Sequence, residues 1–188
     1  LAHHAGQDPL AFRLAHLGDS PEDKRMAAVL QAAADKAGWG TPVADGRARG
    51  IACVTDVDTK VALVAEVSVQ DGRIRVHKVT AAMDCGLVIN PDGAAAQVQG
   101  NVMWGVGSAL LESVTIRDGA VVPGNFDGYP LVTMKESPHV EVILLESGDG
   151  QPRGVGEPAI GPVAPAIGNA VFALTGQRLR RLPFVLNG

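Results

Sequence analysis

The sequence predicts an α+β fold in which a mostly antiparallel sheet packs with a few helices. Two segments with helical periodicity come first, and beyond residue 49 apolar residues follow strand periodicity. The early strands are joined by short turns, and Asp71-Gly72 is a hairpin signal. Strands that follow one another through tight turns pair antiparallel, so we do not expect a doubly wound parallel sheet.

Composition places the 188 residues among globular proteins of one domain or two small ones. Hydrophobic residues make up 46% and charged residues 19%, which is ample for a core. The net charge is −4 and the basic residues are mostly scattered, so we expect no nucleic-acid partner. Cys53 and Cys85 lack metal-site spacing, so we expect two buried free thiols and assign no metal ligands within this chain.

The first 40 residues read as a helical lead-in. Asp8 before a proline is a helix N-cap, and Ser20 before the next proline is another. The second helix carries its apolar residues on one face and stops at Gly38. We therefore expect residues 1–40 to precede a main α+β domain that covers residues 41–188.

Alternating apolar residues predict the strands of that domain. The expected strands are residues 50–57, 60–69, 73–80, 139–146 and a short last one, 180–185. His77 falls on the polar phase of its strand, so we expect it to be exposed. A further hairpin is expected at Asp118-Gly119.

A long helix is predicted over residues 94–111, and it contains Gly100, Gly105 and Gly107. Each interior glycine costs a helix about 1 kcal/mol relative to alanine, so these positions indicate a close approach of the backbone to something. That neighbour is another helix or strand, or it is a bulky ligand. The last helix is expected to run from Val163 to Thr175, with Gly176 as its C-terminal cap.

Glu157 lies in an unusual corner between glycines and a proline. Gly154 and Gly156 permit backbone angles closed to other residues, and Pro158 restricts the glutamate to an extended conformation. Pro158 also suits the first turn of a helix, so we expect Glu157 at a helix N-terminus. Such a carboxylate either serves in acid–base chemistry at a cavity or merely complements the helix dipole.

Other catalytic motifs are missing or fail in context. The residues from Gly154 to Ala159 match the dinucleotide-binding pattern G-x-G-x-x-A, but a loop rather than a strand precedes them. There is no nucleophile elbow, Walker A motif or C-x-x-C pair. Catalysis within this chain would therefore rest on amides or carboxylates. The candidate carboxylates are Asp56, Asp58, Asp84, Glu112, Glu136 and Glu157.

Several motifs in order resemble the C-terminal part of the molybdenum hydroxylases, which include xanthine dehydrogenase and the aldehyde oxidoreductases. The motifs are Asp84-Cys-Gly, Asn90-Pro91, Gln97-Val-Gln-Gly100, Gly105-x-Gly107-x-x-Leu-Leu-Glu112 and Gly154-Val-Gly-Glu157-Pro158. The stretches Gly124-Asn-Phe-Asp-Gly-Tyr-Pro and Pro138-His-Val-Glu-Val look most like the branch that holds the isoquinoline 1-oxidoreductase beta subunits and related bacterial aldehyde dehydrogenases. The resemblance covers nearly the whole chain. Trp104 stands near a position where xanthine dehydrogenases often carry glutamine, and Gln99 stands where many relatives have glutamate.

The resemblance implies that this chain is the C-terminal fragment of a molybdopterin-binding subunit that carries molybdopterin cytosine dinucleotide. It implies that Glu157 is the general base on a molybdenum-bound hydroxyl that hydroxylates an aldehyde or N-heterocycle. Gln97 would contact the metal centre or the pterin, and Gly100 and Gly156 would let backbone reach the cofactor. The resemblance also implies that electrons leave through a partner subunit that carries two [2Fe–2S] clusters. The cofactor would do the redox chemistry, which agrees with the lack of another catalytic motif in this chain.

The resemblance also implies that the rest of the molybdenum subunit supplies the other cofactor loops, so we expect the isolated chain to bind no molybdenum and show no turnover. Relatives in this branch are often exported, which favours the periplasm over the cytoplasm without fixing the compartment. The alternative is a non-catalytic α+β domain that scaffolds or binds a partner. The two hypotheses differ in one respect, since only the enzyme needs Glu157 and Gln97 in one cleft.

Overall fold

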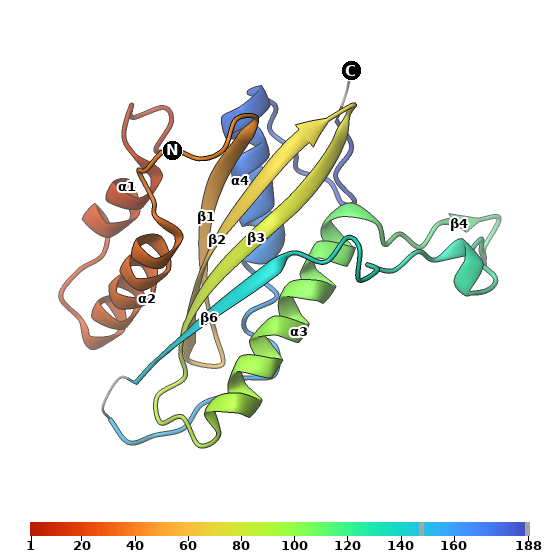
Figure 1. Ribbon diagram of the computed structural model, residues 1–188. Coiled ribbons are helices and arrows are strands. Elements are labelled where there is room, and N and C mark those ends of the chain that lie inside the picture. The colour runs from red at the N-terminus through yellow and green to blue at the C-terminus, as the bar shows by residue number, and fades with distance from the viewer. Residues whose placement is uncertain (147–148, 187–188) are drawn as a thin grey trace.

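Three layers make up the fold in the computed structural model, which describes residues 1–146 and 149–186. Helices α1 and α2 cover one face of a four-stranded sheet, and α3 and α4 pack on the other face (Figure 1). A slender segment that carries β4 reaches away from these layers. The predicted α+β class is confirmed.

The two N-terminal helices begin at the predicted N-caps, and the second one ends at the predicted glycine. Helix α1 (Pro9–Ala15) is capped by Asp8, whose carboxylate accepts two backbone N–H groups. Helix α2 (Pro21–Ala37) is capped by Ser20 and ends at Gly38, which adopts the left-handed conformation that glycine tolerates best. The buried face of α2 packs on the sheet and so ties the lead-in helices to the rest of the chain.

The main sheet has the strand order β1-β2-β3-β6. Its strands are β1 (Arg47–Asp56), β2 (Thr59–Gln70), β3 (Arg73–Asp84) and β6 (His139–Leu145). The first three form the predicted antiparallel meander, and β6 pairs with β3 in parallel. That parallel pairing needs a crossover, and the chain between the two strands supplies it with α3.

The turn between β1 and β2 carries no glycine. Val57 and Asp58 occupy it with φ angles of 42° and 62°, in a region that L-residues rarely adopt. Strained backbone of this kind persists only where surrounding contacts hold it, and it clusters at functional sites. No turn signal marks this position in the sequence, unlike Asp71 and Gly72, which form the predicted hairpin turn with φ angles of 51° and 71°.

The remaining elements are α3 (Pro91–Leu110), β4 (Ile116–Arg117), β5 (Ala120–Val121), the 3-10 turn η1 (Phe126–Gly128) and α4 (Val163–Thr175). The predicted hairpin at Asp118-Gly119 joins β4 to β5. Gly176 ends α4 in the left-handed conformation, as predicted.

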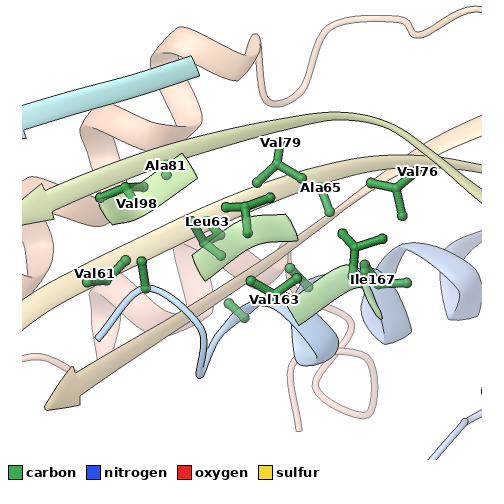
Figure 2. Packing of buried hydrophobic residues seen from close by; sticks show 14 of the residues in the cluster. Val61, Leu63, Ala65, Val76, Val79, Ala81, Val98, Val163 and Ile167 are labelled. Atoms are coloured by element: carbon green, nitrogen blue, oxygen red, sulfur yellow. The ribbon is translucent and has the colours of Figure 1, made fainter. Parts of the chain in front are cut away.

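The larger core lies between the sheet and helices α3 and α4. Figure 2 shows valines and a leucine of β2 and β3 meeting Val98 of α3 and Val163 and Ile167 of α4. All three of these helix residues are almost completely buried. Removal of this apolar surface from water is the main force that holds α3 and α4 against the sheet.

Two local predictions are wrong. Residues 180–185 form no strand, and one reason is that Pro183 lacks an N–H group for a ladder. His77 is half-buried rather than exposed, because a bulge places Glu66 opposite Lys78 and Val67 opposite Val76. His77 is the extra residue in that bulge, and its Nε2 lies 2.8 Å from the hydroxyl of Ser68. Burial lowers the pKa of the imidazole.

The two thiols differ in their surroundings. Cys85 is buried and Cys53 is half-buried, and both are free. The prediction of buried free thiols therefore holds fully for Cys85 and partly for Cys53. Within the described part of the chain, no helix combines the length and apolar character needed to cross a membrane.

Candidate functional site

A pocket of about 780 Å³ opens where three parts of the chain meet. The end of β1, one face of α3 and the turn before α4 form its walls. The lining residues are Val54, Thr55, Asp56, Gln97, Gly100, Asn101, Trp104, Gly156, Glu157, Pro158, Ile160 and Gly161. Four residues predicted to form the site, Glu157, Gln97, Gly100 and Gly156, are therefore gathered around one cavity.

Glu157 faces this cavity, but its corner differs from the predicted one. Helix α4 begins only at Val163, and residues 158–162 form turns before it. The N–H of Ile160 donates to the Glu157 carbonyl at 3.0 Å, and the N–H of Val163 donates to the Ile160 carbonyl. Pro158 is therefore not the first helical residue, and the prediction that Glu157 stands at a helix N-terminus is wrong. The side chain of Glu157 is exposed at the pocket.

Gly100, Gly105 and Gly107 of α3 differ in what surrounds them. A Cβ at Gly105 would lie 2.6 Å from the Cβ of Val163, so this glycine permits close packing of α3 on the start of α4. A Cβ at Gly107 would meet the Glu112 carboxylate at 2.0 Å. At Gly100 a Cβ would meet nothing within 4 Å, and this residue lies on the pocket wall. Of the three, only Gly100 is left open for a ligand.

Asn101 is a site residue that the sequence analysis missed. Its Nδ2 donates to the Gln97 carbonyl and to the Gly156 carbonyl, both at 2.7 Å. The side chain thereby joins α3 to the glycine turn that precedes Glu157. An asparagine inside a helix gives no such signal in sequence, because its partner lies 55 residues away.

The turn before Glu157 is also held from the sheet side. The hydroxyl of Thr59, which is completely buried, donates to the Gly154 carbonyl at 2.6 Å. Gly154 has to be glycine for a local reason, since a Cβ there would lie 2.7 Å from a methyl group of Val57. The strained turn between β1 and β2 therefore packs directly against this segment.

An ion-pair network extends from the turn between β1 and β2. The guanidinium of Arg153 pairs with Asp58 and with Asp149. The hydrogen bond from Arg153 lowers the pKa of the Asp58 carboxyl to about 2. The N–H of Arg153 also donates to the Cys85 carbonyl at 2.9 Å, so this segment is joined to the end of β3.

Arg25 carries the network into the interior. It pairs with Asp84 at 3.0 Å, and both side chains are almost fully buried. This pair links α2 to the end of β3, and Asp84 also accepts the N–H of Gly86 at 2.8 Å. A buried, hydrogen-bonded pair of this kind is costly to break from one side only.

The candidate carboxylates differ in their partners and in whether they line the pocket. Asp58 and Asp84 belong to the ion-pair network, Glu112 accepts the hydroxyl of Tyr129 at 2.8 Å, and Glu136 accepts the hydroxyl of Thr133 at 2.8 Å. Asp56 and Glu157 remain, and both line the pocket. No lysine or arginine is among the described residues that line it, so the charged groups of this wall are both acidic. Within residues 1–146 and 149–186, no group of three or more His, Cys, Asp and Glu is arranged to bind a metal.

Comparison with known proteins identifies the family of this chain. Residues 44–138 match the model of the molybdopterin cofactor-binding domain, a range that includes Gln97 and Gly100 and ends before Glu157. The beta subunit of isoquinoline 1-oxidoreductase from Brevundimonas diminuta is 38% identical over 97% of this chain and 24% of its own length. A nicotinate dehydrogenase subunit of Pseudomonas putida is 35% identical over 97% of this chain and 17% of its own. This chain thus spans a quarter or less of both relatives.

Solved structures share the fold of this region. Quinoline 2-oxidoreductase from Pseudomonas putida 86 matches with a TM-score of 0.61 and 27% identity, over 66% of this chain and 17% of that one. The aldehyde oxidoreductase from Desulfovibrio gigas matches with a TM-score of 0.59 and 26% identity, over 66% and 14%. The chain therefore belongs to the molybdopterin cofactor-binding domain family and is part of a molybdopterin-binding subunit of the molybdenum hydroxylases.

Proposed function

We propose that this chain contributes the general base and part of the pterin pocket to an enzyme that hydroxylates an aldehyde or an N-heteroaromatic carbon. Glu157 is the base, and Gln97, Gly100 and Gly156 contact the cofactor. The observation that carries the proposal is that all four line one cavity, although Glu157 lies far along the sequence from the turn of α3 that holds Gln97 and Gly100.

The cavity wall fits the uncharged end of a pterin cofactor. Gly100 and Gly156 have open space where a Cβ would stand, so a flat ring can approach their backbone. Gln97 is exposed on the same wall, and its amide can both donate and accept hydrogen bonds. Lysine and arginine, the usual phosphate-binding side chains, are missing from the described lining residues, so we assign the phosphate end of the cofactor to other parts of the subunit.

When bound, the molybdenum cofactor supplies the two-electron redox chemistry. The role of Glu157 is proton transfer. Substrate and water give the hydroxylated product, two protons and two electrons, and the carboxylate of Glu157 accepts one of these protons from the oxygen that adds to the carbon. Such a base must lie within hydrogen-bonding reach of that oxygen, and general acid–base catalysis typically contributes about 10²- to 10⁴-fold.

The charge of the cavity favours a neutral substrate. Asp56 and Glu157 both face it, and no cationic side chain is among the described residues of its wall. On this part of the wall a substrate carboxylate would find no cationic partner among the described lining residues, whereas an aldehyde or an uncharged N-heterocycle needs none. The enclosing apolar residues, among them Val54, Trp104 and Ile160, suit such a molecule.

We assign part of the surface of this chain to contact with a further polypeptide. Between residues 113 and 138, six large apolar side chains are more than half exposed, and the segment stands off the main body in Figure 1. The members are Val114, Ile116, Val121, Phe126, Leu131 and Met134. Exposed apolar groups on this scale mark a contact surface, and we assign it to the rest of the molybdenum subunit.

The cofactor form and the electron partner complete the proposal. We infer molybdopterin cytosine dinucleotide and a partner subunit with two [2Fe–2S] clusters. Acid hydrolysis of the purified enzyme should release cytidine monophosphate, and release of another nucleotide would contradict the cofactor assignment. Co-purification of stoichiometric iron with the molybdenum subunit tests the partner.

Substitution of Glu157 in the full-length subunit tests the central role. Glu157→Gln should keep the molybdenum content and lower kcat by at least two orders of magnitude, because the amide cannot accept the proton. Glu146→Gln alters an exposed glutamate just after β6 and should leave kcat unchanged. Retention of full activity by Glu157→Gln would remove this residue from its role and favour the scaffold hypothesis.

A further inference from the structure

We propose that Asn101 and Thr59 are positioning residues that together fix the backbone on which the Glu157 carboxylate stands. Thr59 holds the Gly154 carbonyl from the sheet, and Asn101 holds the Gly156 carbonyl from α3. This inference rests on the proposed function, since it assigns these residues to the support of the same base.

The two hydrogen bonds clamp one short segment from opposite sides. The segment contains Gly154 and Gly156, residues with no side chain to anchor them. Thr59 follows the strained turn of Val57 and Asp58, which also packs against Gly154. Without the two bonds, the glycines would leave the backbone before Glu157 with a wide choice of conformations, and the carboxylate would lose its fixed place at the pocket.

The two neighbours of the Asn101 side chain fix the orientation of its amide group. Both of its neighbours, at Gln97 and Gly156, are carbonyl oxygens that can only accept. The side-chain NH₂ group has two hydrogens and satisfies both, while the flipped amide would set an oxygen against two oxygens. The residue is also only 9% exposed, so water does not readily replace these bonds.

Asn101 also joins the two halves of the proposed site. Its bond to the Gln97 carbonyl lies within α3, and its bond to Gly156 lies across the pocket wall. The position of Gln97, which we assign to the cofactor, is thereby coupled to the position of Glu157, which we assign to the proton. One side chain therefore links the two positions directly.

The first test measures local opening without any cofactor. In this chain, the N–H groups of Arg153 and Ile160 bracket the clamped segment and donate to the carbonyls of Cys85 and Glu157. Asn101→Ala should raise the hydrogen-exchange rate of the Ile160 amide at least tenfold and speed tryptic cleavage after Arg153 by a similar factor. Asn169→Ala is the matched control.

Asn169 donates through its Nδ2 to the Ile51 carbonyl at 3.0 Å, so it makes the same type of bond but is not among the residues that line the pocket. Its alanine variant should leave both rates within twofold. Thr59→Val is a second variant of nearly unchanged volume that removes only the hydroxyl, and it should open the segment as Asn101→Ala does. Thr59→Ser keeps the hydroxyl and should restore protection. Unchanged exchange in both Asn101→Ala and Thr59→Val would overturn the proposal.

The second test uses the cofactor-loaded full-length enzyme. A positioning role predicts that Asn101→Ala lowers kcat at least tenfold with KM changed less than threefold, and that Thr59→Ser retains activity where Thr59→Val loses it. Loss of kcat in Asn169→Ala to the same degree would show a general stability effect and overturn the assignment. If Glu157→Gln is fully active, the proposed base is wrong while the exchange results still decide whether the clamp exists. If Glu157→Gln is inactive and the exchange rates do not move, only the clamp is wrong.

Discussion

Gly50 allows helix α4 to pack closely on the sheet. Adding one methyl group at this position should push α4 away from the sheet and lower the stability of the fold. A Cβ at this position would lie 2.2 Å from the Ala166 carbonyl oxygen and 2.3 Å from the Ala170 nitrogen. Both atoms belong to the backbone of α4, so no side-chain rotation relieves the contact. The helix must recede by about 1.2 Å to reach an ordinary separation of 3.4 Å.

The energetic cost follows from what α4 buries. Val163, Ile167 and Val171 are at most 1% exposed, and each contributes about 2 kcal/mol by burial. A gap of about 1 Å forfeits a quarter to a half of the contact energy, so the loss is about 1.5–3 kcal/mol. Restriction of the unfolded chain by alanine returns about 0.4–1 kcal/mol. We expect Gly50→Ala to lower the free energy of unfolding by about 0.5–2.5 kcal/mol, which is about 1–10 °C in Tm for a chain of this size.

Urea and thermal unfolding, followed by circular dichroism at 222 nm, measure this change. Gly100→Ala is the matched control, because the same substitution there meets nothing within 4 Å and removes a glycine from a helix interior. That variant should be more stable by up to about 1 kcal/mol. The reasoning is refuted if Gly50→Ala is as stable as the unsubstituted chain, or if the two variants change stability in the same direction.

Three further predictions concern charge and thiol reactivity. Arg25→Met leaves the buried Asp84 carboxylate without its cationic partner and should lower the free energy of unfolding in urea by about 3–5 kcal/mol. Arg47→Met removes a partly exposed pair and should lower it by less than about 1 kcal/mol. Equal losses would contradict the role of burial. The folded-state pKa of Asp58, about 2, is below its ordinary value of 3.8, so its contribution to stability is present above pH 4 and is lost as the pH falls toward 2. Asp58→Asn should therefore flatten the dependence of Tm on pH in that window, and an unchanged slope would speak against the pairing. Burial raises the pKa of the Cys85 thiol, so it should react with a disulfide reagent at pH 8 far more slowly in the folded chain than in urea, and equal rates would show that the site is open.

Local sequence signals determined most of the elements. Asp8, Ser20 and Gly38 cap helices because their side chains or backbone freedom satisfy groups within a few residues of themselves. The hairpin at Asp71-Gly72 and the end of α4 at Gly176 follow from equally local chemistry. Such features need no knowledge of the rest of the fold, which is why periodicity and turn residues predicted them.

Features that depend on distant partners were not predicted. The parallel pairing of β6 with β3 is one of them, because the pairing of separated strands leaves no local pattern. His77 was misassigned because the bulge opposite Glu66 and Val67 exists only when two strands pair. The turn at Val57 and Asp58 carries no glycine, and contacts from elsewhere hold it in the left-handed region.

The site also has features that local sequence indicates and features that depend on distant partners. The sequence by itself indicated the types of residue, since the motifs around Glu157 and Gln97 carried the resemblance. Only the tertiary structure decided that these residues share a cavity and that Asn101 and Thr59 hold the turn between them. The physical reason is that a motif records the backbone freedom and chemistry of neighbours in the chain, whereas a pocket is made by segments that hydrophobic burial brings together from far apart.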